Sequence, residues 1–187
     1  METVLTSPAL WMLGSGLLIG RVVIGTLMMA HAGEKLFGWL GGQGLRGTAG
    51  FFEHIGFRPG LRFAAAASLI EMISGLLVML GLLGPVGPAL LISIMIVAAV
   101  SVHRGNGLFA TTNGVEVPLL YTTGALALAL AGYGPYSLDA LLGLDVLWTP
   151  SMTLAVVALG VLVAIGNLAV RRSVVSGTPG RTRAKVS

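Results

Sequence analysis

Residues 62–83 read RFAAAASLIEMISGLLVMLGLL, with a single acidic residue, Glu71, near the middle. A helix needs about 20 mostly apolar residues to cross the hydrocarbon core of a bilayer. This stretch has the required length, and it contains no Gly-Pro or polar break that would end a helix early. It therefore predicts a transmembrane helix with one ionisable side chain inside the membrane.

Four similar stretches lie around it, at about residues 9–32, 85–103, 117–132 and 151–170. The stretch at 117–132 is the shortest. Hydrophobic residues make up 55% of the chain and charged residues 10%, against about 25% charged in a typical soluble domain. The mean hydropathy is +0.93. We therefore predict an all-α, polytopic membrane protein with five spans, whose main partner is the lipid bilayer.

The basic residues predict the orientation, because loops on the cytoplasmic side carry an excess of Lys and Arg. With five spans, ten of the eleven fall on one side of the membrane: Lys35, Arg46, Arg58, Arg62, Arg104, Arg171, Arg172, Arg181, Arg183 and Lys185. This predicts a multi-pass protein of the prokaryotic inner cell membrane, with its N-terminus outside and its C-terminus in the cytoplasm. The net charge of +4 is explained by this topology, so we expect no nucleic-acid partner.

Several chemistries are excluded. The chain has no Cys, so it forms no disulfide and supplies no thiol for catalysis or for an iron–sulfur cluster. Motifs for phosphate, dinucleotide or zinc-protease sites are missing, as is a nucleophile elbow. The sequence contains no self-contained catalytic centre, and whether it belongs to an enzyme stays open. At most it is a subunit of an oxidoreductase.

Arg21 and Glu71 are the two charges inside predicted spans. Each costs roughly 2.5–3.5 kcal/mol at the centre of a span on insertion scales. Counting from the inner ends of their spans places both at the same depth, so we predict an intramembrane ion pair. Gly25 and Gly75 each follow by four residues and favour close helix approach. The pair is either a ligand or proton site or a structural pair that fixes helix register.

A second group of polar residues is expected at the cytoplasmic ends of the spans: His31, Lys35, His103, Asn106 and Tyr121. Such a cluster can hold the carbonyl of a quinone, and two His residues can also ligate haem or a metal. The plainest interpretation is that they are interfacial residues or helix caps. A quinone is the candidate cofactor. We do not expect haem, and we predict no metal site.

The connection at residues 34–61 is rich in glycine and aromatic residues. Aromatic side chains favour the membrane interface, so we predict a short interfacial or re-entrant helix around residues 47–56. Gly16 and Gly20 form a GxxxG motif in the first span, and we expect it to pack against another helix of the same chain.

In combination, these motifs resemble DoxX-type membrane proteins over roughly residues 12–140. The resemblance is carried by Arg21-x3-Gly25, Gly33-x-Lys35-Leu36, Glu71-x3-Gly75-Leu76, His103-Arg-Gly-Asn106-Gly107-Leu-Phe109 and Gly132-Tyr-Gly134-Pro-Tyr-Ser137-Leu138-Asp139. It implies a four-helix transmembrane bundle at residues 1–140. The rest departs from the family plan: an extra transmembrane helix within 141–171 and a disordered basic cytoplasmic tail at 172–187.

The resemblance also implies several functions. Some members of the family are subunits of a thiosulfate:quinone oxidoreductase, others belong to oxidative-stress complexes with superoxide dismutase and a sulfurtransferase, and eukaryotic relatives include a receptor-assembly chaperone. The first hypothesis is therefore a membrane subunit of a redox or sulfur-oxidation complex that binds a quinone or another small lipophilic ligand. The alternative is a non-enzymatic scaffold or assembly factor. Both imply cytoplasmic or membrane protein partners, and a homo-oligomer stays open. A small transporter ranks third, because five spans leave little room for alternating access.

Overall fold

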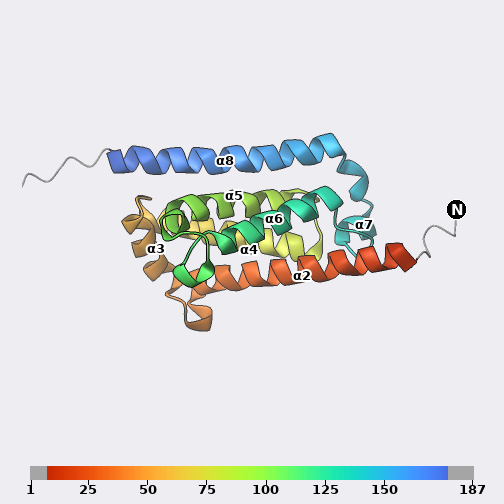
Figure 1. Cartoon of the computed structure of the whole chain (residues 1–187), viewed down its shortest axis with the longest axis horizontal. Helices are drawn as coiled ribbons and strands as arrows, with labels where there is room; N and C mark the ends of the chain where they lie inside the picture. Colours follow the sequence, from red (N-terminus) through yellow and green to blue (C-terminus); the bar gives the residue numbers. More distant parts are fainter. Residues whose placement is uncertain (1–7, 177–187) are drawn as a thin grey trace, which may run out of the picture.

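The computed structural model describes residues 8–176, in which five long helices run along one common axis (Figure 1). Four are long and apolar enough to cross a membrane: Pro8–Phe37, Gly60–Leu80, Val86–Asn106 and Pro150–Arg171. The fifth apolar helix, Glu116–Ala131, has 16 residues, or about 24 Å at the helical rise. The prediction of an all-α membrane fold is confirmed, and the stretch predicted to be shortest is the shortest of these five apolar segments. In chain order they are α2 (Pro8–Phe37), α4 (Gly60–Leu80), α5 (Val86–Ala98), α6 (Glu116–Ala131) and α8 (Pro150–Ser176).

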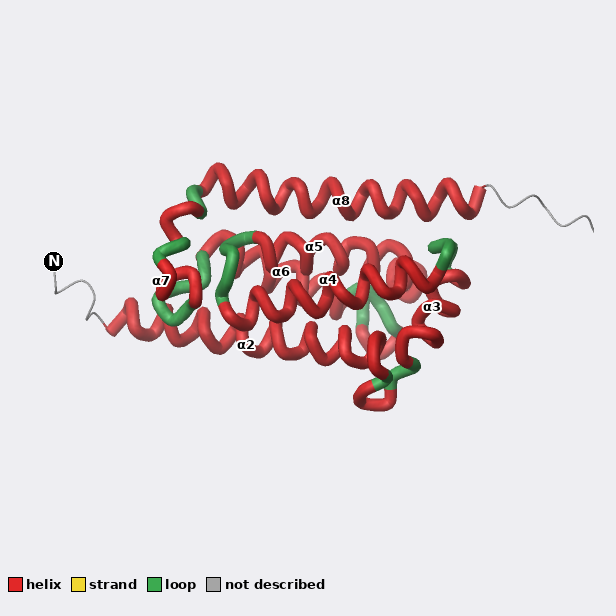
Figure 2. The backbone as a smooth tube through the Cα atoms, turned by 180° about the vertical axis from the view of Figure 1, so that it is seen from behind, coloured by secondary structure: helices red, strands yellow, loops and turns green. Residues whose placement is uncertain are grey.

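Short elements close the two ends of the bundle (Figure 2). One end, called here the α3 end, carries η1 (Trp39–Gly41), α3 (Gly44–His54), the π-helix η2 (Ala99–His103), η3 (Arg104–Asn106) and η4 (Ala110–Thr112). The other, the α7 end, carries α7 (Leu138–Leu142) and η5 (Asp145–Leu147). Helix α3 confirms the short helix predicted around residues 47–56, and it begins three residues earlier.

The helices pack in an order that leaves α2 and α8 on opposite outer sides (Figure 1). Helix α2 lies against α4, and α5 lies between α4, α6 and α8. The buried core is formed where α2, α4, α5 and α6 meet, by Met28, Val78, Leu91, Ile92, Met95, Ala125, Leu128 and Tyr133. The predicted four-helix bundle is thus α2, α4, α5 and α6, and α8 is the added helix.

Small residues set the closest helix contacts. A Cβ placed on Gly25 would lie 2.5 Å from the carbonyl oxygen of Gly75, and one on Gly75 would lie 2.7 Å from the carbonyl oxygen of Gly25. Helices in lipid gain no hydrophobic driving force from association, so close backbone contact is a main source of packing energy. The predicted close approach of α2 and α4 at these glycines is confirmed.

The GxxxG motif of the first span behaves differently. A Cβ on Gly16 or Gly20 would have no atom within 4 Å among those that the structure describes. The expectation that this motif packs within the chain is therefore wrong. Gly16 and Gly20 lie on a face of α2 that is turned away from the segment that Gly14 and Arg21 contact.

Helix α8 packs on α5, and a Cβ on Gly160 would lie 2.6 Å from the carbonyl oxygen of Ala89. The helix continues to Ser176, so the first five residues of the tail predicted at 172–187 are helical. The rest of that tail lies outside the described residues. Near the α3 end, Nε of Arg171 donates to the carbonyl oxygen of Ile55 at 2.7 Å, which attaches α8 to the end of α3.

Candidate functional site

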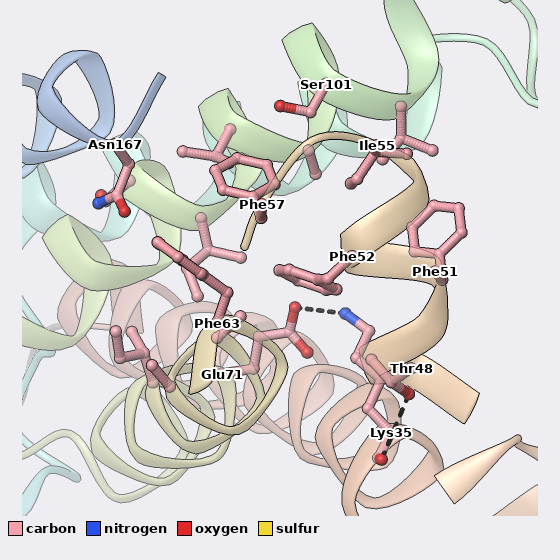
Figure 3. A pocket seen from close by; sticks show the side chains of 18 of the residues that line it. Lys35, Thr48, Phe51, Phe52, Ile55, Phe57, Phe63, Glu71, Ser101 and Asn167 are labelled. Atoms are coloured by element: carbon pink, nitrogen blue, oxygen red, sulfur yellow. Dashed lines mark hydrogen bonds and ion pairs between the residues drawn. The ribbon is translucent and has the colours of Figure 1, made fainter. Parts of the chain in front are cut away.

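Glu71 is ion-paired with Lys35. The Lys35 ammonium lies 2.5 Å from Oε1 of Glu71, and the Glu71 side chain is 3% exposed while that of Lys35 is 32% exposed. Lys35 lies in the last turn of α2 and Glu71 near the middle of α4, so the long lysine side chain extends along the bundle to reach the carboxylate (Figure 3). A membrane-embedded acid is therefore neutralised by a base from the end of the neighbouring helix.

Arg21, the predicted partner, lies elsewhere, and the predicted Arg21–Glu71 pair is wrong. Arg21 and Glu71 each precede a crossing glycine by four residues, but the helices are antiparallel. The two charges therefore lie on opposite sides of the crossing, about 12 Å apart along the axis. Counting depth from the predicted ends of the spans gave the wrong pairing, because α2 continues to Phe37, five residues beyond its predicted end.

Beside the Lys35–Glu71 pair is a cavity of about 410 Å³ between α3, α4, α5, η2 and α8. Its walls are mainly apolar, with nine polar side chains among the 23 residues that line it. Figure 3 shows Lys35 and Glu71 on one side, Ser101 on another and Asn167 of α8 on a third. The polar side chains that line it include Glu34, Lys35, Gln43, Thr48, Glu71, Ser93, Ser101, His103 and Asn167.

Four phenylalanines form a continuous aromatic wall along the cavity. The ring centroids of Phe51 and Phe52 are 6.3 Å apart, those of Phe52 and Phe57 5.7 Å, and those of Phe57 and Phe63 5.3 Å. These separations suit tilted or edge-to-face aromatic packing. All four rings line the cavity, so a flat ligand entering it would meet aromatic faces and edges.

Two buried polar atoms on the cavity walls have no hydrogen-bond partner among residues 8–176. They are Oε2 of Glu71 and Oγ of Ser101. Buried polar atoms are rarely left unpaired, so each such atom calls for an explanation. Ser101 lies in the π-helix η2, and π turns inside helices are frequent at functional sites. Sequence reasoning missed Ser101, because one serine in an apolar stretch gives no signal of its own.

The predicted cytoplasmic-end cluster is divided into separate contacts. Nδ1 of His103 and Nδ2 of Asn106 both lie close to the carbonyl oxygen of Asn113, at 2.8 and 3.2 Å. Because that oxygen accepts, His103 donates. These contacts close the loop after η2, and His103 also lines the cavity.

The other members of that cluster lie apart from this loop. His31 packs edge-on against Tyr121 with ring centroids 6.2 Å apart, and its Nδ1 lies 3.6 Å from Glu34. Of the five predicted residues, Lys35 and His103 line the cavity and the other three do not. In the part of the chain that the structure describes, no three His, Asp or Glu side chains gather as metal ligands would.

At the α7 end, Arg21 is 2% exposed and donates to the carbonyl oxygens of Tyr133 and Tyr136. It thereby holds the segment after α6 against α2. Tyr133 is buried beside it, and burial together with nearby Asp139 raises the pKa of the Tyr133 phenol. The phenol stays protonated. Arg21 therefore joins α2 to the segment after α6 at this end of the bundle.

Asp139 forms a second anchor at the α7 end that sequence reasoning did not single out as a site. Its carboxylate accepts from the backbone N–H groups of Leu83 and Gly84, at 2.8 and 2.6 Å, and from Nε1 of Trp148 at 3.0 Å. It is 2% exposed. The α4–α5 turn, α7 and the start of α8 are thus joined by one carboxylate.

The helices and their hydropathy define an integral, multi-pass membrane protein of the all-α class. The model of the DoxX family matches residues 16–104, just under half of the chain, and this match supports the predicted membership of the DoxX family. The matched part runs from α2 to the end of η2 and includes Lys35, Glu71 and Ser101, whereas α6 and α8 lie beyond it. No curated protein and no solved structure matches the chain.

Proposed function

We propose that this protein is the membrane subunit of a redox complex and that its cavity binds a quinone or another small lipophilic molecule. The observation that carries the proposal is the unpaired carboxylate oxygen of Glu71, buried on the wall of an apolar cavity inside a membrane bundle. Ligand sites are typically pockets of about 300–1,000 Å³ with apolar walls and a few polar groups. The cavity beside Glu71 has this character.

The remaining chemistry falls to other chains. A chain without Cys supplies no thiol for electron transfer or sulfur chemistry, and the cavity holds no group that transfers electrons by itself. Its contribution to a redox complex is to bind the lipophilic partner within the membrane. A soluble or membrane partner would then carry the redox centre, which agrees with the membrane-subunit reading.

Native mass spectrometry with lipid extraction, on protein purified gently from its own membrane, tests the proposal. Ala67 lines the cavity, so Ala67→Leu should fill part of it and remove a retained molecule. Ala155→Leu on the exposed face of α8 is the matched control and should keep it. If the wild-type protein carries no small molecule and binds none on titration with a short-chain quinone or quinol, the ligand proposal is refuted.

A scaffold or assembly factor is the second candidate, and one surface favours it. The connection from α2 to α3 exposes Phe37, Trp39 and Leu40 at 61, 57 and 85%. Leu40 also has a φ of 54°, which is unusual for a bulky residue. In this reading the cavity is incidental. A folded Lys35→Met/Glu71→Leu variant should then retain the activity of its complex, and Leu40→Ser should lose partners.

A further inference from the structure

We infer that the ligand of this cavity is a neutral aromatic hydroxyl compound, bound through a hydrogen bond that its hydroxyl donates to Oε2 of Glu71. The inference rests on the proposed function, because it specifies which lipophilic molecule the cavity takes. It follows from three features of the site: the charge balance, the kind of atom left unpaired and the shape of the walls.

The charge balance selects a neutral ligand. Lys35 lies 2.5 Å from Oε1 of Glu71, so the pair carries no net charge. Glu34 also lines the cavity, but its side chain is 48% exposed, so water screens its charge. A cationic ligand would leave one positive charge in a mainly apolar cavity, and an anionic ligand would leave one negative charge. Burying an uncompensated charge is costly. The site therefore disfavours both the lipophilic cations that a lone buried glutamate would attract and lipophilic anions.

The unpaired atom selects a hydrogen-bond donor. An ionised carboxylate only accepts, and Oε2 of Glu71 has no donor among residues 8–176. A ligand hydroxyl satisfies it, whereas a ligand carbonyl or ether oxygen cannot. The Lys35 ammonium is a donor that also lines the cavity, so an acceptor oxygen on the ligand can bond to it, but only a ligand hydroxyl can satisfy Oε2 of Glu71.

The walls select a flat ring with a second oxygen. Figure 3 places Ser101 and Glu71 on different walls, with the rings of Phe52 and Phe57 between them. Oγ of Ser101 is buried and unpaired within the described chain, and a hydroxyl can both donate and accept. An aromatic ring packs well on the phenylalanine wall. A ring with oxygens at two positions, as in a hydroquinone, offers a partner for each of the two unpaired atoms.

Binding to the purified full chain in nanodiscs tests this inference with three matched probes: a short-chain benzoquinol, its quinone and its dimethyl ether. A hydrogen bond to a charged acceptor changes affinity by roughly tenfold or more. We therefore expect the quinol to bind at least about tenfold more tightly than either other probe. Dissociation constants are measured under anaerobic conditions, which keep the quinol reduced.

Two variants locate the effect. Lys35→Met/Glu71→Gln removes both charges and should bring the quinol and the quinone to within about threefold of each other. Ser101→Ala should weaken quinol binding several-fold, while Ser151→Ala, at the α7 end and away from the cavity, should not change it. Unchanged melting temperatures would show that these variants fold.

The outcomes separate the two proposals. If quinone, quinol and ether bind equally, the donor inference is overturned while the lipophilic ligand site stands. A lipophilic cation serves as a fourth probe. If it binds more tightly than the quinol, the argument from charge balance is overturned. If none of the probes binds, the ligand site itself fails, and with it the proposed function. A quinol preference lost in the Glu71 double variant supports the inference.

Discussion

Gly25 of α2 and Gly75 of α4 contact each other through their backbones, since a Cβ on either would lie 2.5–2.7 Å from the other's carbonyl oxygen. This contact fixes the register of two antiparallel helices. It places Glu71 on the side of the crossing that faces the end of α2, where Lys35 can reach it. It places Arg21 on the opposite side, where it meets the carbonyl oxygens of residues 133 and 136.

Gly25→Leu should destabilise the bundle by about 1–3 kcal/mol or more, because the added side chain forces apart two backbones in contact. Gly16→Leu is the matched control, since nothing described lies within 4 Å of a Cβ there, and it should change stability by less than about 0.5 kcal/mol. Thermal unfolding in detergent measures both. Equal melting temperatures for the two variants would contradict the crossing.

Lys35→Met should destabilise the protein more than the double change Lys35→Met/Glu71→Leu. The single variant leaves a carboxylate buried without its partner, which costs about 3–5 kcal/mol for a fully buried pair. Lys35 is one-third exposed, so we expect about 2–3 kcal/mol. The double variant removes both charges and should recover most of that loss. Chemical denaturation of the two variants and the wild type measures this, and additive losses would argue against an ion pair.

Much of the fold is predictable from sequence because lipid imposes a simple rule. A spanning helix satisfies its own backbone, so runs of about 20 apolar residues mark the spans. Aromatic and glycine content likewise predicts α3. The Gly25 and Gly75 prediction succeeded for a related reason, since glycine spaced from a charge by one turn marks a face where a neighbour can approach.

The partners of the buried charges were harder to predict, because depth was measured from the ends of the spans. The loop residues determine where each helix ends, so the observed ends differ from the predicted ones by several residues. Counting from the crossing glycines, Gly25 and Gly75, is more reliable, and it places Arg21 and Glu71 on opposite sides of the crossing. The same count places Lys35 on the side of Glu71. It does not predict how far the flexible lysine side chain extends.

The cavity itself depends on features without a clear sequence signal. The π-helix at Ala99–His103 turns Ser101 toward the cavity, and an apolar run gives no sign of where a helix widens. Helix α8 closes one wall because Gly160 packs on Ala89. Such a contact between residues 71 positions apart requires the fold to be known.

Asp139→Asn should loosen the α7 end. The Asp139 carboxylate accepts from Leu83 and Gly84, and Leu83 has a φ of 59°, a conformation that a leucine adopts only when held. An amide can replace one of these bonds but not all. We expect a loss of about 1–3 kcal/mol and a red shift of Trp148 emission in a Trp11→Phe/Trp39→Phe background. Asp145→Asn, at an exposed position, should change neither signal. An unshifted Trp148 spectrum in Asp139→Asn would mean that the carboxylate does not order this end.

The predicted orientation can be read directly, because a chain without Cys gives no background in thiol labelling. Val146 near α7 and His54 at the end of α3 are both exposed, at opposite ends of the bundle. If the basic residues face the cytoplasm, as their distribution predicts, a membrane-impermeant maleimide should label Val146→Cys in intact cells. It should label His54→Cys only after permeabilisation. The reverse pattern would show that the orientation is opposite to the predicted one. The Lys35–Glu71 cavity would then lie near the outer surface of the membrane, where a partner on the cytoplasmic side could not reach it. Labelling of both cysteines from one side would contradict five crossings.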